Sequence, residues 1–248
     1  AAIGTVVAQA AAAGLMVWIL RRGAVAGIRP TLRLHAFDGP AVRDLFRVGW
    51  PAATDMVVLN AGFLSIVGML GRIDQSAVAA HGVGLRVQAL AFVPGMSIAQ
   101  ATGALVGAAL GGGRVAEAHK VVRASVVLCV LIMGLLCLAL VWQAGPIVQL
   151  FHIQEGTPLF RYSVMWMTLL AACMPFAGVY ISFSGMLQGA GSTRTSLRIN
   201  AVVTAVQIPL SWLLGFPMGL GAWGVWVGFP LSFVVKMFWG GIVYRQGK

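Results

Sequence analysis

Polar side chains recur at helical spacing in an apolar stretch near the C-terminal end of the sequence. They are Asn200, Thr204, Gln207 and Ser211. On a helix with 100° per residue they fall within about 60° of one another. Such a face either lines a polar cavity for a ligand or forms hydrogen bonds to a neighbouring helix. Both interpretations are open, and the extent of the stripe along the whole segment favours the cavity wall.

A charge also lies deep within an apolar run, because Arg86 has no acidic residue within ten positions on either side. A charge at the centre of a bilayer costs about 2.5–3.5 kcal/mol on insertion scales and is expected to face a bundle interior or a wet cavity. At about 1.5 Å per residue, Arg86 and Asn60 lie near the midplane, and Asp55 lies about 10 Å from the inner boundary. We therefore expect Asn60, Asp55 or a carbonyl freed by a helix break to partner Arg86.

Two further residues could contact a ligand beside a predicted helix break at Pro94. Phe92 and Met96 are four positions apart, and aromatic faces attract flat organic cations. Core packing is the alternative, and it is the commoner arrangement for each residue by itself. The predicted substrate-binding residues are Asp55, Asn60, Arg86, Phe92, Met96, Asn200, Thr204 and Gln207.

Signatures of enzymes are absent from the sequence. It has no HExxH, GxSxG or phosphate-binding loop and no carboxylate pair. Its three cysteines and four histidines have no metal-ligand spacing. No catalytic residue, metal site or organic cofactor is therefore predicted.

The composition indicates that these residues lie in segments that span a membrane. Of 248 residues, 59% are hydrophobic and 9% are charged, whereas soluble domains have about 25% charged residues. Apolar segments long enough to cross a ~30 Å hydrocarbon core lie at 1–20, 48–71, 77–110, 121–144, 162–188, 195–215 and 222–244. They are too long, and alternate too little, for barrel strands. The predicted fold is an all-α integral membrane protein, a polytopic bundle of about seven transmembrane helices in contact with lipid.

The basic residues predict the orientation. The net charge of +11 is scattered among connectors, without the basic and aromatic patch that nucleic-acid binding requires. If residue 20 is cytoplasmic, most of the 17 lysines and arginines lie inside, and only Arg72 and Arg161 lie outside, as the positive-inside rule demands. The C-terminus is then cytoplasmic. Lys236 is expected to extend to the inner interface, and Trp223, Trp226 and Trp239 to anchor at interfaces.

Segment 21–47 is the longest connector and is predicted to join two halves of a larger protein. A short helix beginning at Pro40 is expected to lie on the cytoplasmic membrane surface. Within 77–110, a kink is expected at Pro94, and Gly103, Gly107 and Gly111 are expected to let a neighbouring helix approach closely.

Three segments carry a family resemblance. "AVAAHGVGLRVQALAFVPGMSIAQATGALVGAALGGGRVAEAHK" resembles the second helix and following loop in the C-terminal half of multidrug and toxic compound extrusion (MATE) transporters. "SGMLQGAGSTRTSL" resembles that family's "RGAGDTR"-type helix exit, with Ser192 where Asp is common, and "FRVGWPAATD" resembles the entry to its seventh helix. By this resemblance, residues 1–20 are the last helix of an N-terminal lobe, 21–47 the inter-lobe linker and 48–248 the C-terminal six-helix lobe.

The resemblance implies a two-lobed antiporter of the plasma (inner) membrane that exports drug-like organic cations in exchange for protons or sodium ions. Its partner would be the N-terminal lobe. Arg86 matches an arginine of the family's eighth helix, and Asp55 is the nearest candidate for a carboxylate on the seventh. Residues 162–188 contain no Asp or Glu, so this chain departs from members with a carboxylate on the tenth helix. That departure leaves the N-terminal lobe as an alternative place for the whole coupling site.

Two rival functions remain open. A lipid-linked sugar flippase of the same superfamily would need a strongly basic cavity to hold pyrophosphate, and only Arg86 is central in this sequence. A non-transporting membrane scaffold would have no need of the polar face in segment 195–215.

Overall fold

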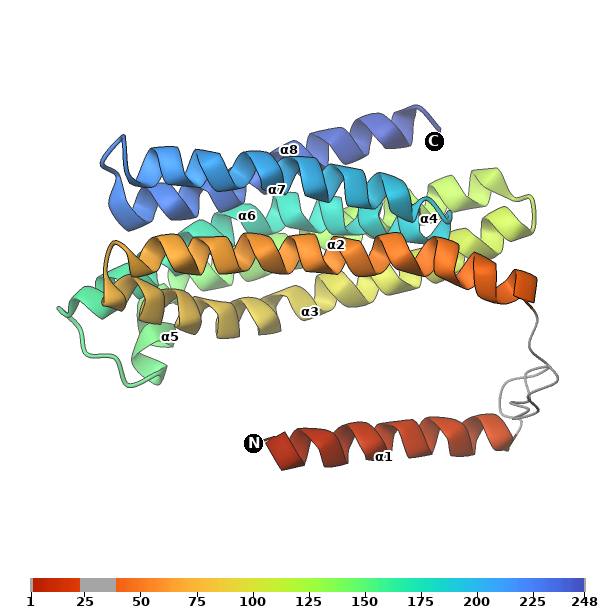
Figure 1. Cartoon of the computed structure of the whole chain (residues 1–248), viewed down its shortest axis with the longest axis horizontal. Coiled ribbons are helices and arrows are strands. Elements are labelled where there is room, and N and C mark those ends of the chain that lie inside the picture. Colours follow the sequence, from red (N-terminus) through yellow and green to blue (C-terminus); the bar gives the residue numbers. More distant parts are fainter. Residues whose placement is uncertain (1, 23–38, 248) are drawn as a thin grey trace. The chain divides into compact units, whose positions relative to one another are not determined.

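The computed structural model describes residues 2–22 and 39–247, and within them all regular structure is helical. The helices are α1 (Ala2–Arg21), α2 (Gly39–Gly71), α3 (Gln75–Gly111), α4 (Val115–Trp142), α5 (Ala144–Leu150), α6 (Pro158–Gly189), α7 (Thr193–Gly215) and α8 (Gly221–Arg245) (Figure 1). The chain divides into two compact units, Ala1–Phe46 and Arg47–Lys248. The second unit contains every helix from α3 to α8, together with all of the predicted substrate-binding residues.

Six helices in the described ranges are long and apolar enough to cross a membrane, which confirms the predicted all-α, polytopic fold. They are the part of α2 from Leu45 onward, α3, α4, α6, α7 and α8. The first of the seven expected spans is not among them, since α1 contains only the shorter apolar stretch Gln9–Ile19. The short helix α5 was not predicted.

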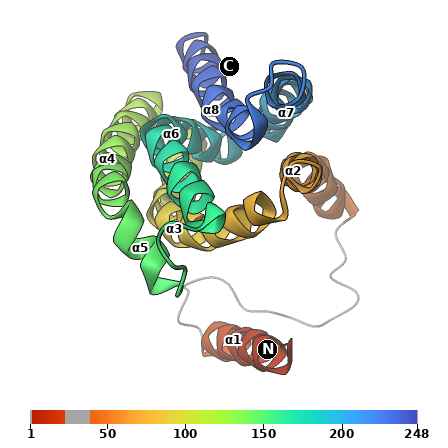
Figure 2. The ribbon, with the colours of Figure 1, turned by 90° about the vertical axis from the view of Figure 1, so that its left-hand side faces the viewer.

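Helix α6 lies at the centre of the second unit. It packs against α3, α4, α5, α7 and α8, and Figure 2 shows α3, α4 and α8 around it. A helix that is apolar on all sides is stable only when it is surrounded by other helices or lipid. Its start is fixed by Thr157, whose hydroxyl accepts a hydrogen bond from the Phe160 amide at 3.2 Å, followed by Pro158 in the first turn.

Glycines bring the backbones of α3 and α6 into contact. A methyl group added to Gly103 would lie 3.1 Å from the carbonyl oxygen of Gly185, and one added to Gly107 would lie 3.2 Å from that of Gly189. Methyl groups on Gly185 and Gly189 would overlap the backbone of Ala99 and Gly103 respectively. The close approach expected at Gly103 and Gly107 is confirmed, whereas no atom lies within 4 Å of a methyl group added to Gly111.

Prolines interrupt the backbone hydrogen bonding of most spanning helices. They are Pro51 in α2, Pro94 in α3, Pro175 in α6, Pro209 in α7 and Pro230 in α8. The ribbon of α3 bends near its middle, where Pro94 lies (Figure 1). The short helix expected from Pro40 is the first part of α2, which runs without a break from Gly39 through Pro51. Its position on the membrane surface stays a prediction. A membrane helix tolerates the single amide that proline removes.

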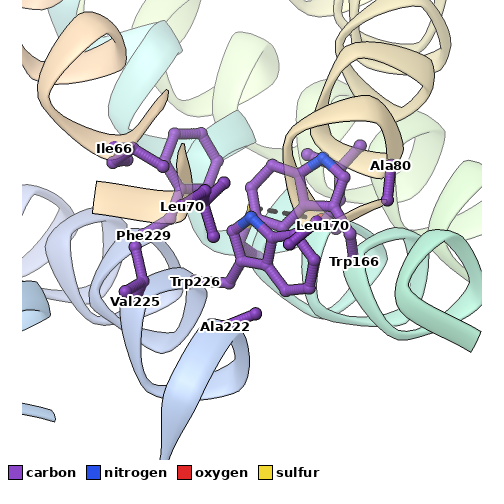
Figure 3. Close-up of a cluster of buried hydrophobic side chains, with 11 residues drawn as sticks. Ile66, Leu70, Ala80, Trp166, Leu170, Ala222, Val225, Trp226 and Phe229 are labelled. Atoms are coloured by element: carbon purple, nitrogen blue, oxygen red, sulfur yellow. Dashed lines mark hydrogen bonds between the residues drawn. The ribbon is translucent and has the colours of Figure 1, made fainter. Parts of the chain in front are cut away.

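An aromatic cluster packs near the α2–α3 turn (Figure 3). The rings of Trp166 and Trp226 stack with centroids 5.5 Å apart, and the Phe229 ring meets Trp166 edge-on at 5.6 Å. Trp226 is not the interfacial anchor that the sequence predicted, because its side chain is completely buried in a cluster with residues of α2, α3 and α6. His81 also lies against Trp166, at 4.9 Å, and neither ring nitrogen has a partner among the described residues.

Candidate functional site

A buried polar centre forms where α2, α6, α7 and α8 meet. Its members, which we call the Asp55 centre, are Asp55, Tyr180, Ser196, Asn200 and Lys236. The Asn200 side-chain amide donates to one Asp55 oxygen at 2.7 Å, and the Ser196 hydroxyl donates to the other at 3.2 Å. Both carboxylate oxygens are therefore occupied by donors from α7, which stabilises a buried charge.

Asp55 is distinct among the acidic residues. By sequence position it is the only one of the six that lies in the interior of a spanning helix. Asp74 instead caps the start of α3 through the Ser76 amide, and Glu117 pairs with Arg114 in the first turn of α4. A carboxylate at this depth is expensive and marks a functional site by default.

Lys236 supplies the opposite charge. The sequence predicted that its side chain extends to the inner interface, and this prediction is wrong, because only 3% of the residue is exposed. Its ammonium lies 5.4 Å from the Phe233 ring and 5.7 Å from the Tyr180 ring, and it interacts electrostatically with Asp55. Helices α6 and α7 pack against α8, so the side chain is enclosed by the bundle and is not left to lipid or water.

Tyr180 lies beside Lys236 and also beside the residues that hold Asp55. Its ring faces Lys236, and its hydroxyl lies beside Ser196 and Asn200. The hydroxyl makes no hydrogen bond of normal geometry to a described residue, and neither does the side-chain carbonyl oxygen of Asn200. The centre thus retains two polar atoms that can bind a proton donor or a water molecule.

The polar stripe on α7 faces inward, as the spacing predicted. Asn200, Thr204, Gln207 and Ser211 are all buried. On the opposite face, Val202, Val206 and Leu213 are each about half exposed, as residues in contact with lipid would be.

The stripe serves two purposes along its length. Asn200 donates a hydrogen bond to Asp55 of α2, so this part of the stripe fits the alternative of hydrogen bonds to a neighbouring helix. Gln207 and Thr204 line a small cavity of about 40 Å³ between α2, α7 and α8, which fits the alternative of a cavity wall. Ser211 packs tightly against Gly228 and has no hydrogen-bond partner in the described ranges.

The cavity has a polar and an aromatic side. Its polar lining is Thr204, Gln207, Ser232 and Lys236, and its apolar lining is Leu59, Gly62, Phe63, Ile66, Phe229 and Phe233. The lining combines aromatic faces with a few polar groups, as sites for small organic ligands do, but in this structure the cavity has room for water only.

Arg86 lies elsewhere. It is exposed on α3, and no hydrogen bond or ion pair joins it to another residue in the described ranges. The predicted pairing with Asp55 or Asn60 is therefore wrong: Asp55 faces α7, and the Asn60 amide donates to the Met56 carbonyl of its own helix at 2.8 Å. Depth alone placed Arg86 and Asn60 together, but each points to the outside of this unit.

Phe92 and Met96 also lie in different environments. Phe92 is half-buried with its ring 6.2 Å from that of Phe233, which fits the core-packing alternative. Met96 is half exposed.

Three members of the Asp55 centre are absent from the predicted binding residues. Ser196 lies four positions before Asn200 and extends the α7 stripe by one turn, so helical spacing could have found it. Lys236 is visible as a lone charge in an apolar run, but its burial depends on α6 and α7. Tyr180 gives no sequence signal.

Comparison with known proteins decides the family. The family model described as MatE matches residues 51–213. The chain belongs to the MATE family. It is 30% identical over 207 residues to the probable multidrug resistance protein NorM of Bradyrhizobium diazoefficiens, which covers 82% of this chain and 44% of that protein. A NorM relative from Deinococcus radiodurans is 30% identical over 234 residues, or 91% of this chain and 51% of that one.

Solved structures share the fold of this MATE chain. A MOP-superfamily transporter from Pyrococcus furiosus superposes with a TM-score of 0.90 at 20% identity, over 99% of this chain and 55% of that chain. An outward-facing multidrug resistance MATE transporter gives 0.89 at 20% identity, also over 99% and 55%. The chain therefore spans about half the length of the relatives that it matches. As a MATE protein it is a multi-pass membrane protein and not an enzyme.

Proposed function

We propose that this chain is the C-terminal half of a secondary antiporter that exports drug-like organic cations in exchange for protons or sodium ions. The observation that carries the proposal is Asp55, a carboxylate buried at membrane depth and held by two donors beside a polar and aromatic cavity. Multidrug resistance relatives of about twice the length support it.

The proposed division of the chain follows the expected one. Residues 1–20 are the last helix of the N-terminal lobe, 21–47 the linker and 48–248 the C-terminal lobe, which binds the N-terminal lobe as its partner. The separation of Ala1–Phe46 from Arg47–Lys248 supports this division. Residues 23–38 of the linker lie outside the described residues.

The proposed substrate path combines buried residues with residues that are exposed on this unit. Thr204, Gln207 and the adjoining Asp55 centre form the buried part. Asn60, Arg86 and Met96 are exposed on α2 and α3, which is what residues that face the other lobe would show. Phe92 is proposed to border the buried part through its contact with Phe233.

The presence of Lys236 does not support the alternative function as a lipid-linked sugar flippase. A second central cation would favour pyrophosphate, but Asp55 offsets its charge. The scaffold alternative does not account for a carboxylate and an ammonium buried together, since each carries a desolvation cost.

Export by the full-length transporter tests the proposal. Cells lacking their own efflux pumps and expressing it should accumulate less ethidium than cells with an Asp55→Asn variant. Collapse of the proton gradient, or of the sodium gradient, should abolish the difference and identify the coupling ion. Equal accumulation in cells with and without the wild-type transporter, across several organic cations, would refute the antiporter assignment.

A further inference from the structure

Helices α7 and α8 leave a groove between them on the surface of the second unit. They touch closely around one point, because a methyl group added to Gly228 would overlap the Ser211 side chain, and one added to Gly224 would overlap the Leu214 carbonyl. From this contact the two helices diverge toward the C-terminal end of α8 (Figure 1). The groove lies where they have separated, and its volume is about 110 Å³.

The groove opens on the side of α7 and α8 that faces away from α2. Gln207 and Ser232 line both the groove and the small cavity beside α2, so they separate the two spaces. No residue of α2 lines the groove. The residues proposed to face the other lobe lie instead on α2 and α3. The groove is therefore on a face that the surrounding membrane can reach.

The shape and lining of the groove fit a hydrocarbon chain. Val202 and Val206 of α7 and Leu231 and Val235 of α8 line it, and each is about half exposed. An apolar cavity of about 150 Å³ can hold a benzene ring, so this groove has room for a few carbon atoms. Its lining on α7 extends over eight positions to Leu210, or about 12 Å, which favours an elongated occupant.

Two exposed arginines mark one end of the groove. Arg198 precedes Val202 by one helical turn and shares its face of α7. Arg245 follows Val235 and Ile242 at helical spacing on the exposed face of α8. Helices α7 and α8 contain no acidic residue, and neither arginine forms an ion pair in the described part of the chain. The two positive charges therefore lack a counter-ion from the protein.

We propose that the α7–α8 groove binds one acyl chain of an anionic phospholipid, from the leaflet at the basic end of the unit, and that Arg198 and Arg245 bind its phosphate. Guanidinium groups bind phosphate through paired hydrogen bonds. Trp239 lines the groove at the end nearest the arginines, and an indole is favoured at the level of lipid headgroups. A second copy of this chain is a poorer occupant, because it would bring its own arginines to the same level of the membrane.

Lipid titration of the purified full-length transporter tests the inference, with native mass spectrometry to count the bound lipids. The first phosphatidylglycerol should bind about fivefold more tightly than phosphatidylcholine, because its net charge is negative. Arg198→Gln should weaken this first step by about fivefold. Arg123→Gln, the same substitution at an exposed position on α4, is the matched control and should leave the first step unchanged.

A second variant tests the groove separately from the arginines. Val206→Trp fills the groove, so the acyl chain loses its packing contacts and the first phosphatidylglycerol should bind at least about threefold more weakly. Leu213→Trp is the matched control, because Leu213 is exposed on the same helix to a similar extent but does not line the groove. Its affinity for the lipid should equal that of the wild type.

Four outcomes would overturn the inference. Equal affinity of the wild type for the two lipids would reject the arginines as ligands of an anionic headgroup. Displacement of the lipid by inorganic phosphate would indicate a site for free phosphate, without a role for the acyl chain. Unchanged lipid binding in a monodisperse Val206→Trp protein would reject the groove, and a wild-type dimer that this substitution dissociates would assign the groove to a second copy. None of these measurements depends on transport, so each result leaves the proposed function standing.

Discussion

At the scale of single residues, the distinguishing feature is a buried carboxylate that is held by two neutral hydrogen-bond donors. Asp55 receives hydrogen bonds from Asn200 and Ser196. Hydrogen bonds to a charged acceptor are stronger than those between neutral groups. The two donors come from adjacent turns of one helix, so α7 alone fixes both oxygens and orients the carboxylate relative to Lys236.

The contribution of this arrangement to stability can be measured at Asn200. Asn200→Leu keeps the volume but leaves one buried carboxylate oxygen without a donor, so the free energy of unfolding should fall by about 1–3 kcal/mol. Asn60→Leu is the matched control, because Asn60 is exposed and bonds only to its own helix, and its effect should stay within about 0.5 kcal/mol. Denaturant titration in mixed micelles gives both values. Equal losses for the two variants would contradict the role assigned to Asn200.

At the scale of helices, α7 combines a packing face and a cavity face in one stripe. The end near Asn200 binds α2, the middle at Gln207 lines the cavity, and the end at Ser211 packs against Gly228 of α8. A stripe of uniform spacing therefore does not have a uniform environment.

This division predicts a difference within the stripe. In a full-length transporter without native cysteines, cysteine at Gln207 should react with a hydrophilic thiol reagent, because thiolate forms in a hydrated cavity. Cysteine at Ser211 should not react, since this residue is fully buried. Cysteine at Val206 should not react either, because hydrocarbon covers that face. Reaction at Ser211 as fast as at Gln207 would show that the whole stripe lines the cavity.

The crossing of α3 and α6 gives a second prediction at this scale. Gly189→Ala places a methyl group onto the Gly103 backbone, and such overpacking should lower the free energy of unfolding by about 1–3 kcal/mol. Gly134→Ala in α4 is the control, because nothing lies within 4 Å of its added methyl group, and alanine there should be neutral or stabilising by up to about 1 kcal/mol. Denaturant titration compares the two, and a harmless Gly189→Ala would mean that the helices are not held at this distance.

Sequence reasoning succeeded where the deciding information was local. Apolar length located the spans, and 100° per residue placed Thr204 and Gln207 on the buried face, because both follow from the geometry of one helix. It failed for Arg86, since depth along a helix does not determine which way a residue faces. The burial of Lys236 depends on α6 and α7, and no property of its own segment encodes it.

At the scale of the molecule, basic residues gather at one end of the second unit. The α3–α4 turn, the α6–α7 turn and the C-terminus lie at the same end (Figure 1). Exposed basic residues at that end are Arg114, Lys120, Arg123, Arg194, Arg198 and Arg245. The positive-inside rule predicts that this is the cytoplasmic end, which supports the proposed location in the inner membrane with a cytoplasmic C-terminus.

Labelling of intact cells tests this orientation. Single cysteines at Ala116 and Gln246 in the full-length transporter should react with a membrane-impermeant maleimide only after permeabilisation. A cysteine at Gln154, in the exposed loop before α6, should react in intact cells. The reverse pattern would invert the proposed topology.

The distribution of prolines has a mechanical consequence. A proline lacks the amide that closes the preceding turn, so bending stiffness is lowest there. Five spanning helices each contain such a proline, whereas α4 contains none. Helix α4 packs along α3 and α6 and, because it contains no proline, is expected to limit their bending. When this unit flexes during a transport cycle, curvature should therefore concentrate on the side formed by α2, α7 and α8, which surrounds Gln207 and Lys236.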